Sequence, residues 1–400
     1  MELKPGFKQT EAGVIPEDWE VESLENITDS QRPISYGIVQ TGPIIPHGVK
    51  CLRIVDIENG QINKDDLITT SQTISTTYKR TILRMGDLVM PLIAKVGDVA
   101  LVDQDLCGAN LTRGVALIAI RADMNALFFK QLISSVAVRN KLAKLMNGSA
   151  LQEIPVATLR AFKIGFPPSL AEQSAIANAL GDADTLIQSL ASLIAKKRQI
   201  GRGVMQTLLN PYKNGQLQAG WVVKKLGNIL RVRRGKSQHD VIDKNGQYPI
   251  LATGGEIGRA SKYLCDKPSV LIGRKGTIDV PQYMEHPFWP IDTLFYTEIF
   301  EPNNAKYLFY QFNLIDWRAH NEASGVPSLS ARTIEHIEIS IPCAEKQARI
   351  ASILADMDAE IAALEAKLAK YRRIKQGMMQ NLLTGRIRLA QPDSNAAAVA

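Results

Sequence analysis

The chain has 400 residues, enough for two or three domains with separate hydrophobic cores. Apolar residues make up 45% of it and charged residues 22%, and no apolar run is long enough to span a membrane, so we expect a soluble cytoplasmic protein. The formal net charge of +7 suits a phosphate-rich partner, and the scattered cysteines and histidines argue against a metal site.

The first half of the chain opens on a short frame and closes on a long helix. The frame is W-x-V-x-x-L-x-N-I at Trp19–Ile27. The run 86–103 is rich in β-branched residues and is interrupted by glycines, which predicts strands joined by tight turns. One helix is expected within 125–146, then a glycine- and serine-containing loop, a short strand within 162–167 and the long helix 176–209.

The second half repeats this order. The frame recurs at Trp221–Ile229, and "RVRRGKSQHD" follows as a predicted basic loop. The run 267–280 again predicts strands and a turn, and one helix is expected within 304–321. A short strand within 337–342 leads into a second long helix, 350–383. Sixteen of its 34 residues are identical to those of 176–209, at a constant offset of 174 (350 minus 176). We therefore predict two long modules related by an internal repeat.

In both long helices the spacing between successive apolar residues alternates between four and three positions, which is typical of a coiled-coil seam. The seam residues are Ile176, Leu180, Ile187, Leu190 and Ile194 in the first helix, and Ile350, Leu354, Ile361, Leu364 and Leu368 in the second. Two matched seams favour pairing with each other. Because the first helix enters the second module, an antiparallel pair needs no long return, and we expect the modules at its opposite ends. The alternative is that each helix packs only on its own module.

A second apolar row occurs in the first helix alone, at Ala179, Leu186, Leu193 and Ile200. The second helix has Glu360 and Lys367 in that row. The extra row predicts that the first helix contacts a further surface, either its own module or another subunit.

Two unlike modules on a rigid spacer suit a DNA target with two separated parts, because one face of B-DNA recurs every 34–36 Å. The chain resembles the DNA-specificity (S) subunits of type I restriction-modification systems. The resemblance rests on "EAGVIPEDWEVESLENI", the repeated frame, the helix entries "FPPSLAEQSAIANAL" and "IPCAEKQARIASIL", and the helix exits "MQTLLN" and "MQNLLTG". It covers residues 13 to about 388.

The resemblance implies an α+β fold of two β-rich, mixed α/β target-recognition domains separated by paired antiparallel helices with pseudo-two-fold symmetry. We expect a first recognition domain at 1–167, a central helix at 168–212, a second recognition domain at 213–342, a C-terminal helix at 343–388 and a disordered tail at 389–400. The implied partners are double-stranded DNA, two adenine-N6 methyltransferase subunits and a restriction/translocase subunit. S-adenosylmethionine, ATP and Mg²⁺ would then be bound by the partners, and no cofactor or metal by this chain.

Candidate DNA contacts follow from chemistry, since Arg and Lys read guanine while Asn and Gln read adenine. In the second module they are Arg231, Arg233, Arg234, Lys236, Ser237, Gln238, Arg274 and Lys275. In the first module they are Gln31, Arg32, Lys95, Asn110, Thr112 and Arg113. The alternative for the basic loop is a solvated turn.

No catalytic residues are predicted. "NPY" at 210–212 lacks the second proline of amino-methyltransferase loops, and Pro211 is better explained as a helix terminator. "GKS" at 235–237 lacks the glycine that a phosphate-binding loop requires. The rival hypothesis is a non-catalytic coiled-coil scaffold without sequence-specific DNA binding.

Overall fold

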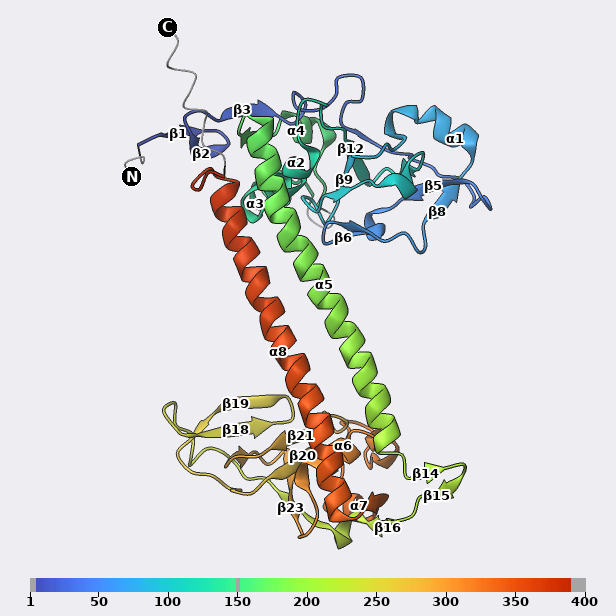
Figure 1. The fold of residues 1–400 in the computed structure, drawn as a ribbon, viewed down its shortest axis with the longest axis vertical. Coiled ribbons are helices and arrows are strands. Elements are labelled where there is room, and N and C mark those ends of the chain that lie inside the picture. The colour runs from blue at the N-terminus through green and yellow to red at the C-terminus, as the bar shows by residue number, and fades with distance from the viewer. Residues whose placement is uncertain (1–4, 149–151, 390–400) are drawn as a thin grey trace. The chain divides into compact units, whose positions relative to one another are not determined.

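The chain forms two compact units in a computed structural model that describes residues 5–148 and 152–389. Unit 1 holds the described residues up to Leu190 and from Lys367 onward, and unit 2 holds Ala191–Ala366. The boundary falls within each of two long helices, so each unit contains part of both (Figure 1). The predicted five-part division of the chain stays a prediction, and its tail lies outside the described residues except for Leu389.

Within its described residues, unit 1 is built from short strands, four short α-helices and three 3-10 helices. The strands are β1 (Phe7–Thr10), β2 (Gly13–Pro16), β3 (Glu20–Ser23), β4 (Ser35–Tyr36), β5 (Val49–Leu52), β6 (Ile57–Glu58), β7 (Gln61–Ile62), β8 (Ile68–Thr70), β9 (Leu88–Pro91), β10 (Ala100–Leu101), β11 (Asn110–Leu111), β12 (Val115–Ile118) and β13 (Lys163–Phe166). The helices are α1 (Gln72–Thr77), α2 (Ala126–Ile133), α3 (Val136–Ala143) and α4 (Val156–Ala161). The main sheet has the order β10-β9-β12-β4, and every residue of β9 and β12 is buried.

Unit 2 contains a corresponding set. Its strands are β14 (Tyr212–Lys213), β15 (Gln216–Leu217), β16 (Trp221–Lys225), β17 (Leu230–Arg234), β18 (Tyr248–Ala252), β19 (Gly255–Ala260), β20 (Ser269–Gly273), β21 (Gln282–Met284), β22 (Trp289–Pro290), β23 (Leu294–Ile299) and β24 (Glu338–Pro342). Its short helices are α6 (Ala305–Phe312), α7 (Ala331–His336) and the 3-10 helices η4 (Leu226–Asn228) and η5 (Trp317–His320). The order β17-β23-β20-β21 repeats β4-β12-β9-β10, and the pair β16–β24 repeats β3–β13. The predicted strands within 86–103, 162–167, 267–280 and 337–342 are therefore confirmed.

The prediction of one continuous helix after each sheet was wrong. In unit 1 the segment 125–146 forms α2 and α3, because the Ser135 side chain accepts from the Val138 N–H and starts a new helix. In unit 2 α6 ends at Phe312, and the Asp316 side chain accepts from the Ala319 N–H to start η5. Serine and aspartate stabilise a helix start better than a helix interior.

The long helices are α5 (Leu170–Leu208) and α8 (Ala344–Leu382), each of 39 residues. Seam residues Ile176, Leu180, Leu190, Ile194, Ile350, Leu354 and Leu368 are buried, and Ile187, Ile361 and Leu364 are half-buried. In unit 1 Ile176 and Leu180 share a core with Leu382 and Met378. In unit 2 Leu208 shares a core with Ile350. The predicted antiparallel pairing is confirmed, and the placement of the two modules along it stays a prediction.

Ion pairs follow the same antiparallel register. Asp184 accepts from Lys375 at 2.5 Å in unit 1, and Lys197 contacts Glu360 at 2.8 Å in unit 2. Each unit therefore contains its own matched part of the helix pair. In the second apolar row, Ala179 packs on the core of unit 1, whereas Leu193 and Ile200 are 40% and 45% exposed.

Equivalent buried glutamines join each long helix to the globular part of its unit. In unit 1 the Gln173 side chain accepts from the Asn125 N–H at 2.9 Å and donates to the Pro167 carbonyl at 2.9 Å. In unit 2 Gln347 accepts from the Asn304 N–H at 3.0 Å and donates to the Pro342 carbonyl at 3.0 Å. Asn125 and Asn304 cap α2 and α6, so one glutamine fixes the strand end, the cap and the long helix together.

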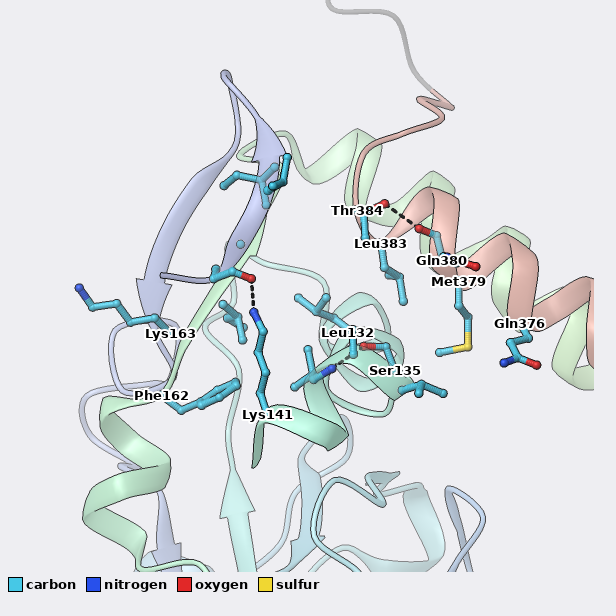
Figure 2. A pocket seen from close by; sticks show the side chains of 18 residues that line it. Leu132, Ser135, Lys141, Phe162, Lys163, Gln376, Met379, Gln380, Leu383 and Thr384 are labelled. Carbon is cyan, nitrogen blue, oxygen red and sulfur yellow. Dashed lines mark hydrogen bonds between the residues drawn. The ribbon is translucent and has the colours of Figure 1, made fainter. Parts of the chain in front are cut away.

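The end of α8 packs against the first hairpin and α3 in unit 1. Figure 2 shows Met379 of α8, and Leu383 directly after that helix, facing Leu132 across a cavity of about 360 Å³. Lys141 crosses this cavity and donates to the Ala12 carbonyl, and burial lowers the pKa of its ammonium. Gly385 has φ +66° and lies so close to Pro16 that an added Cβ would be 2.2 Å from that ring. The first hairpin and the segment at the end of α8 thus lie against each other within unit 1.

None of the helices in residues 5–148 and 152–389 combines the length and hydrophobicity needed to cross a bilayer.

Candidate nucleic-acid interface

One end of the main sheet of unit 2 collects basic side chains from separate parts of the sequence. Strand β23 lies between β17 and β20 and runs antiparallel to both. Arg234, the last residue of β17, pairs with Phe295, and Gly273, the last residue of β20, pairs with Leu294. The end of β17 and the residues after it, the residues after β20 and those before β23 therefore meet at one place. We call this place the unit 2 edge, and it contains Arg234, Lys236, Arg274, Lys275 and Asp292.

Asp292 lies between two of the arginines. The Arg274 Nε donates to the Asp292 backbone carbonyl at 2.8 Å. A terminal nitrogen of Arg234 lies 3.8 Å from the Asp292 carboxylate, with both side chains about half exposed. An exposed ion pair of this length contributes little to stability. Because both side chains are about half exposed, both charged groups remain accessible to a ligand.

Two loops support the edge. The Lys236 N–H donates to the Pro290 carbonyl at 3.0 Å, and the Lys236 carbonyl accepts from the Trp289 indole at 3.1 Å. On the other side, Lys275 forms an isolated bridge with Ser328, which belongs to the predicted glycine- and serine-containing loop. Lys236 and Lys275 are exposed, as is Ser237, while Gln238 is half-buried.

The predicted basic loop is in fact partly a strand. Arg231, Arg233 and Arg234 belong to β17, whose main chain pairs with β23, and only Lys236, Ser237 and Gln238 lie in the loop that follows. Arg233 contacts Glu298 at 3.0 Å, and Arg231 lies opposite Glu298 near the far end of the strand. At about 3.3 Å per residue, Arg231 lies roughly 10 Å from Arg234 along the strand. The predicted basic residues are therefore not one cluster, because Arg231 lies away from the unit 2 edge.

Unit 1 has the same edge with different side chains. Here β4 ends at Tyr36, β9 ends at Pro91 and β12 begins at Val115, and the residues after and before these ends meet. Lys95, Thr112 and Arg113 of the predicted set lie here, in what we call the unit 1 edge. The Lys95 ammonium donates to the Ile57 carbonyl at 3.3 Å, and the Thr112 hydroxyl donates to the Leu52 carbonyl at 3.0 Å. Arg113 is exposed.

The structure does not bring three other predicted residues of unit 1 to this edge. Gln31 and Arg32 precede β4, and therefore lie near the opposite end of the sheet. Both terminal nitrogens of Arg32 bind the Asp87 carboxylate, at 2.6 and 2.7 Å, and the Arg32 side chain is 12% exposed. Asn110 has no exposed surface at all. We therefore leave these residues out of the proposed interface.

The Asn110 amide is fully used inside unit 1. Its oxygen accepts from the Thr81 hydroxyl at 2.7 Å and the Leu111 N–H at 2.8 Å, and its nitrogen donates to the Ser75 carbonyl and hydroxyl. Asn110→Ala should lower the free energy of unfolding by about 1–3 kcal/mol, because these buried groups lose their partners. DNA affinity per folded molecule should be unchanged. Denaturant unfolding combined with a DNA titration checks both, and selective loss of DNA affinity would contradict the structural role.

Sequence reasoning missed two parts of the site. Asp292 and the Ser328 loop lie far from the basic residues in the chain, and neither carries a motif. The only available signal was that Asp292 comes just before the buried strand β23. Because β23 runs antiparallel to β17 and β20, its start lies beside the ends of those two strands, where the basic residues are. Within residues 5–148 and 152–389, no three His, Cys, Asp or Glu side chains are grouped as metal binding requires.

A family comparison connects this geometry to known proteins. The model of the type I restriction modification DNA specificity domain matches residues 16–196 and again residues 218–371. The chain belongs to the type I restriction-modification DNA specificity family. The two matches correspond to the two halves of the internal repeat, each with its own edge and long helix.

Members of the specificity family from distant organisms are similar to this chain. It is 27% identical over 209 residues to the type I restriction enzyme EcoBI specificity subunit of Escherichia coli, covering 52% of this chain and 44% of that protein. A match to the MjaVIII specificity subunit of Methanocaldococcus jannaschii likewise spans 43% of that protein. The putative MjaX specificity subunit of the same organism is 24% identical over 420 residues, covering 96% of this chain and 97% of that protein.

Two solved structures share the fold. The S subunit from M. genitalium matches with a TM-score of 0.67 at 16% identity, covering 96% of this chain and 98% of that one. A chain from a study of complex assembly and conformational transition of the type I R-M system matches with a TM-score of 0.57 at 18% identity, covering 93% of this chain and 99% of that one. The expected α+β fold with two recognition domains and two long helices is thereby confirmed.

Proposed function

We propose that this chain is the DNA-specificity subunit of a type I restriction-modification complex. Each unit reads one half of a bipartite DNA target, the unit 1 edge one half and the unit 2 edge the other. The observation that carries the proposal is the pair of equivalent sheet edges with different polar side chains. Equivalent scaffolds support the same mode of docking, and different side chains support different base sequences.

The long helices fit the role of a spacer between half-sites. Both are continuous over 39 residues, and their seam residues are buried or half-buried. A paired helix resists bending because its apolar face is packed along its length. In this proposal the gap between half-sites is set by the helices, and no protein group reads the bases within it.

Methyltransferase subunits are the proposed partners of the helices. Leu193 and Ile200 lie seven residues apart on one stripe of α5 and are 40% and 45% exposed. Such a stripe suits an apolar helix or surface of another subunit. Two adenine-N6 methyltransferase subunits would supply S-adenosylmethionine chemistry, and a restriction/translocase subunit would supply ATP- and Mg²⁺-dependent cleavage. The chain itself is then non-catalytic and cytoplasmic.

Methylome sequencing tests this function in cells. A strain with this chain and its methyltransferase should carry N6-methyladenine at a motif of two short halves separated by a fixed gap. Deletion of the chain alone should remove methylation at that motif and leave other motifs unchanged. An unaltered methylome in a strain with an active system would contradict the proposal.

Salt-dependent DNA binding separates this function from the scaffold alternative. A specificity subunit in its complex should bind random duplex DNA with an affinity that falls as salt rises, because phosphate contacts release counterions. A coiled-coil scaffold should bind no DNA at any salt concentration.

A further inference from the structure

Arg274 differs from the other basic residues of the unit 2 edge in how firmly it is held. Its N–H donates to the Thr293 carbonyl at 2.8 Å, and its carbonyl accepts from the Leu329 N–H at 3.0 Å. Its Nε donates to the Asp292 carbonyl at 2.8 Å. Main chain and side chain are thus fixed by contacts to two separate segments, one before β23 and one before α7.

The contact through Nε leaves the other side of the guanidinium available. In the part of the chain that the structure describes, no acceptor is hydrogen-bonded to either terminal nitrogen of Arg274. Two parallel donors at the end of a planar group match the O6 and N7 acceptors of guanine in the major groove. Because the side chain is already ordered, little conformational entropy is lost on binding.

The neighbouring cations are less suited to this task. Arg234 is 58% exposed and faces the Asp292 carboxylate, while Lys236 and Lys275 are exposed point charges on flexible stems. Such groups suit phosphates, which accept from many directions and carry no sequence information. Arg274 is half-buried and its Nε is held by the Asp292 carbonyl, so its planar end has the fixed orientation that reading a base edge requires.

The corresponding position of unit 1 has different chemistry. The residue of unit 1 that matches Arg274 in the sheet register is Leu92, which follows β9 as Arg274 follows β20. Its N–H donates to the Gly114 carbonyl at 2.8 Å and its carbonyl accepts from the Ile154 N–H at 2.9 Å, which is the same pattern of main-chain hydrogen bonds as at Arg274. The Leu92 side chain is 1% exposed and belongs to the core of unit 1. Leucine has no side-chain hydrogen-bond donor, so the two edges differ at equivalent positions.

We propose that Arg274 reads a guanine in the half of the DNA target that unit 2 binds, through its two terminal nitrogens. This inference rests on the proposed function. It assigns one base and one residue, and it makes Asp292 a positioning residue that acts through its backbone carbonyl.

A methylation selection tests the assignment. The complex with its methyltransferase subunits is incubated with S-adenosylmethionine and a duplex library of randomised sequence, and methylated molecules are sequenced. The wild-type motif should contain a guanine at one fixed position of one half. Arg274→Lys keeps the charge but loses the fork, and should reduce the preference for guanine there on the order of 10- to 100-fold. Every other position should be unchanged.

Two further variants make the test specific. Arg259→Ala removes one positive charge from β19, in another sheet of unit 2, and should leave the motif intact. Arg274→Gln should weaken guanine preference at the same position, with adenine gaining because a glutamine amide matches its acceptor and donor. Thermal unfolding and co-purification with the methyltransferase subunits show that each variant is folded.

Three results would overturn the assignment. The first is an unchanged motif with Arg274→Lys and Arg274→Gln. The second is an equal loss of affinity for all sequences with Arg274→Gln but not Arg274→Lys, which identifies a phosphate contact. In both cases the bipartite motif and the proposed function survive. The third is a wild-type complex with no bipartite motif, which removes the proposed function as well.

Discussion

Arg388→Ala should lower the free energy of unfolding by about 3–5 kcal/mol, because it leaves a buried carboxylate without its partner. Arg388 lies just beyond α8 and binds two carboxylates. Its Nε and Nη2 contact the Glu172 oxygens at 2.5 and 2.7 Å, and its terminal nitrogens contact Asp18 at 3.0 and 2.8 Å. The Glu172 side chain is only 3% exposed. One guanidinium thus joins the start of α5, the segment after the first hairpin and the end of α8.

Thermal or denaturant unfolding of the variant measures this effect. Arg386→Ala is a matched control, because Arg386 is exposed and makes no ion pair within the described residues. Glu172→Gln in the Arg388→Ala background should recover part of the loss, since a neutral amide is less costly to bury. Equal stability of the Arg388 and Arg386 variants would contradict the argument.

Acidification gives a second readout of the same contact. The hydrogen bond from Arg388 is the main cause that lowers the pKa of Asp18 from 3.8. A lowered pKa in the folded state means that the pair contributes stability above about pH 4, and that this part is lost as pH falls through the lowered pKa. Its size is modest because Asp18 is half exposed. The difference between wild type and Arg388→Ala should therefore narrow at acid pH and stay constant near neutrality.

Arg234→Ala combined with Lys236→Ala should weaken DNA binding about equally for all sequences. Both side chains are exposed at the unit 2 edge, where they suit phosphate contacts. Each phosphate contact contributes about 0.9 to the slope of log affinity against log salt, so the double variant should flatten that slope by roughly 1.8. Titrations of the complex with random duplex DNA at several salt concentrations measure the slope.

The control for this pair is again Arg259→Ala, which removes an exposed charge already paired with Glu256 at 3.1 Å. It should leave the slope unchanged. If affinity and slope were the same in wild type and the double variant, Arg234 and Lys236 would lie outside the DNA interface. A change restricted to one base position would instead show that they read sequence.

Local patterns in the sequence were sufficient for the large elements. The alternation of four and three predicted both long helices and their pairing, because a buried stripe along a helix requires that spacing. The repeat of 176–209 in 350–383 predicted the two-module organisation. The single helices expected within 125–146 and 304–321 were wrong, because Ser135 and Asp316 can cap a new helix as readily as they can occupy a helix interior.

The candidate site was less accessible from the sequence. Arginine, lysine and asparagine were chosen for the chemistry of their side chains, and chemistry alone does not distinguish an exposed reader from a buried contact. Asn110 is such a case, since Thr81 and Ser75 satisfy its amide in the interior. Arg32 is another, since Asp87 holds its guanidinium from 55 residues away.

The sequence by itself determined the two long helices with their apolar seams, because the seam depends on the spacing of residues close together along the chain. It also determined the two-module organisation, because the same segment is repeated 174 residues later. Only the tertiary structure decided which polar side chains meet at a sheet edge. Strand order places β17, β20 and β23 together, and no local pattern records that order. The same holds for Arg388, whose two carboxylate partners are 216 and 370 residues away in the chain and adjacent only after folding.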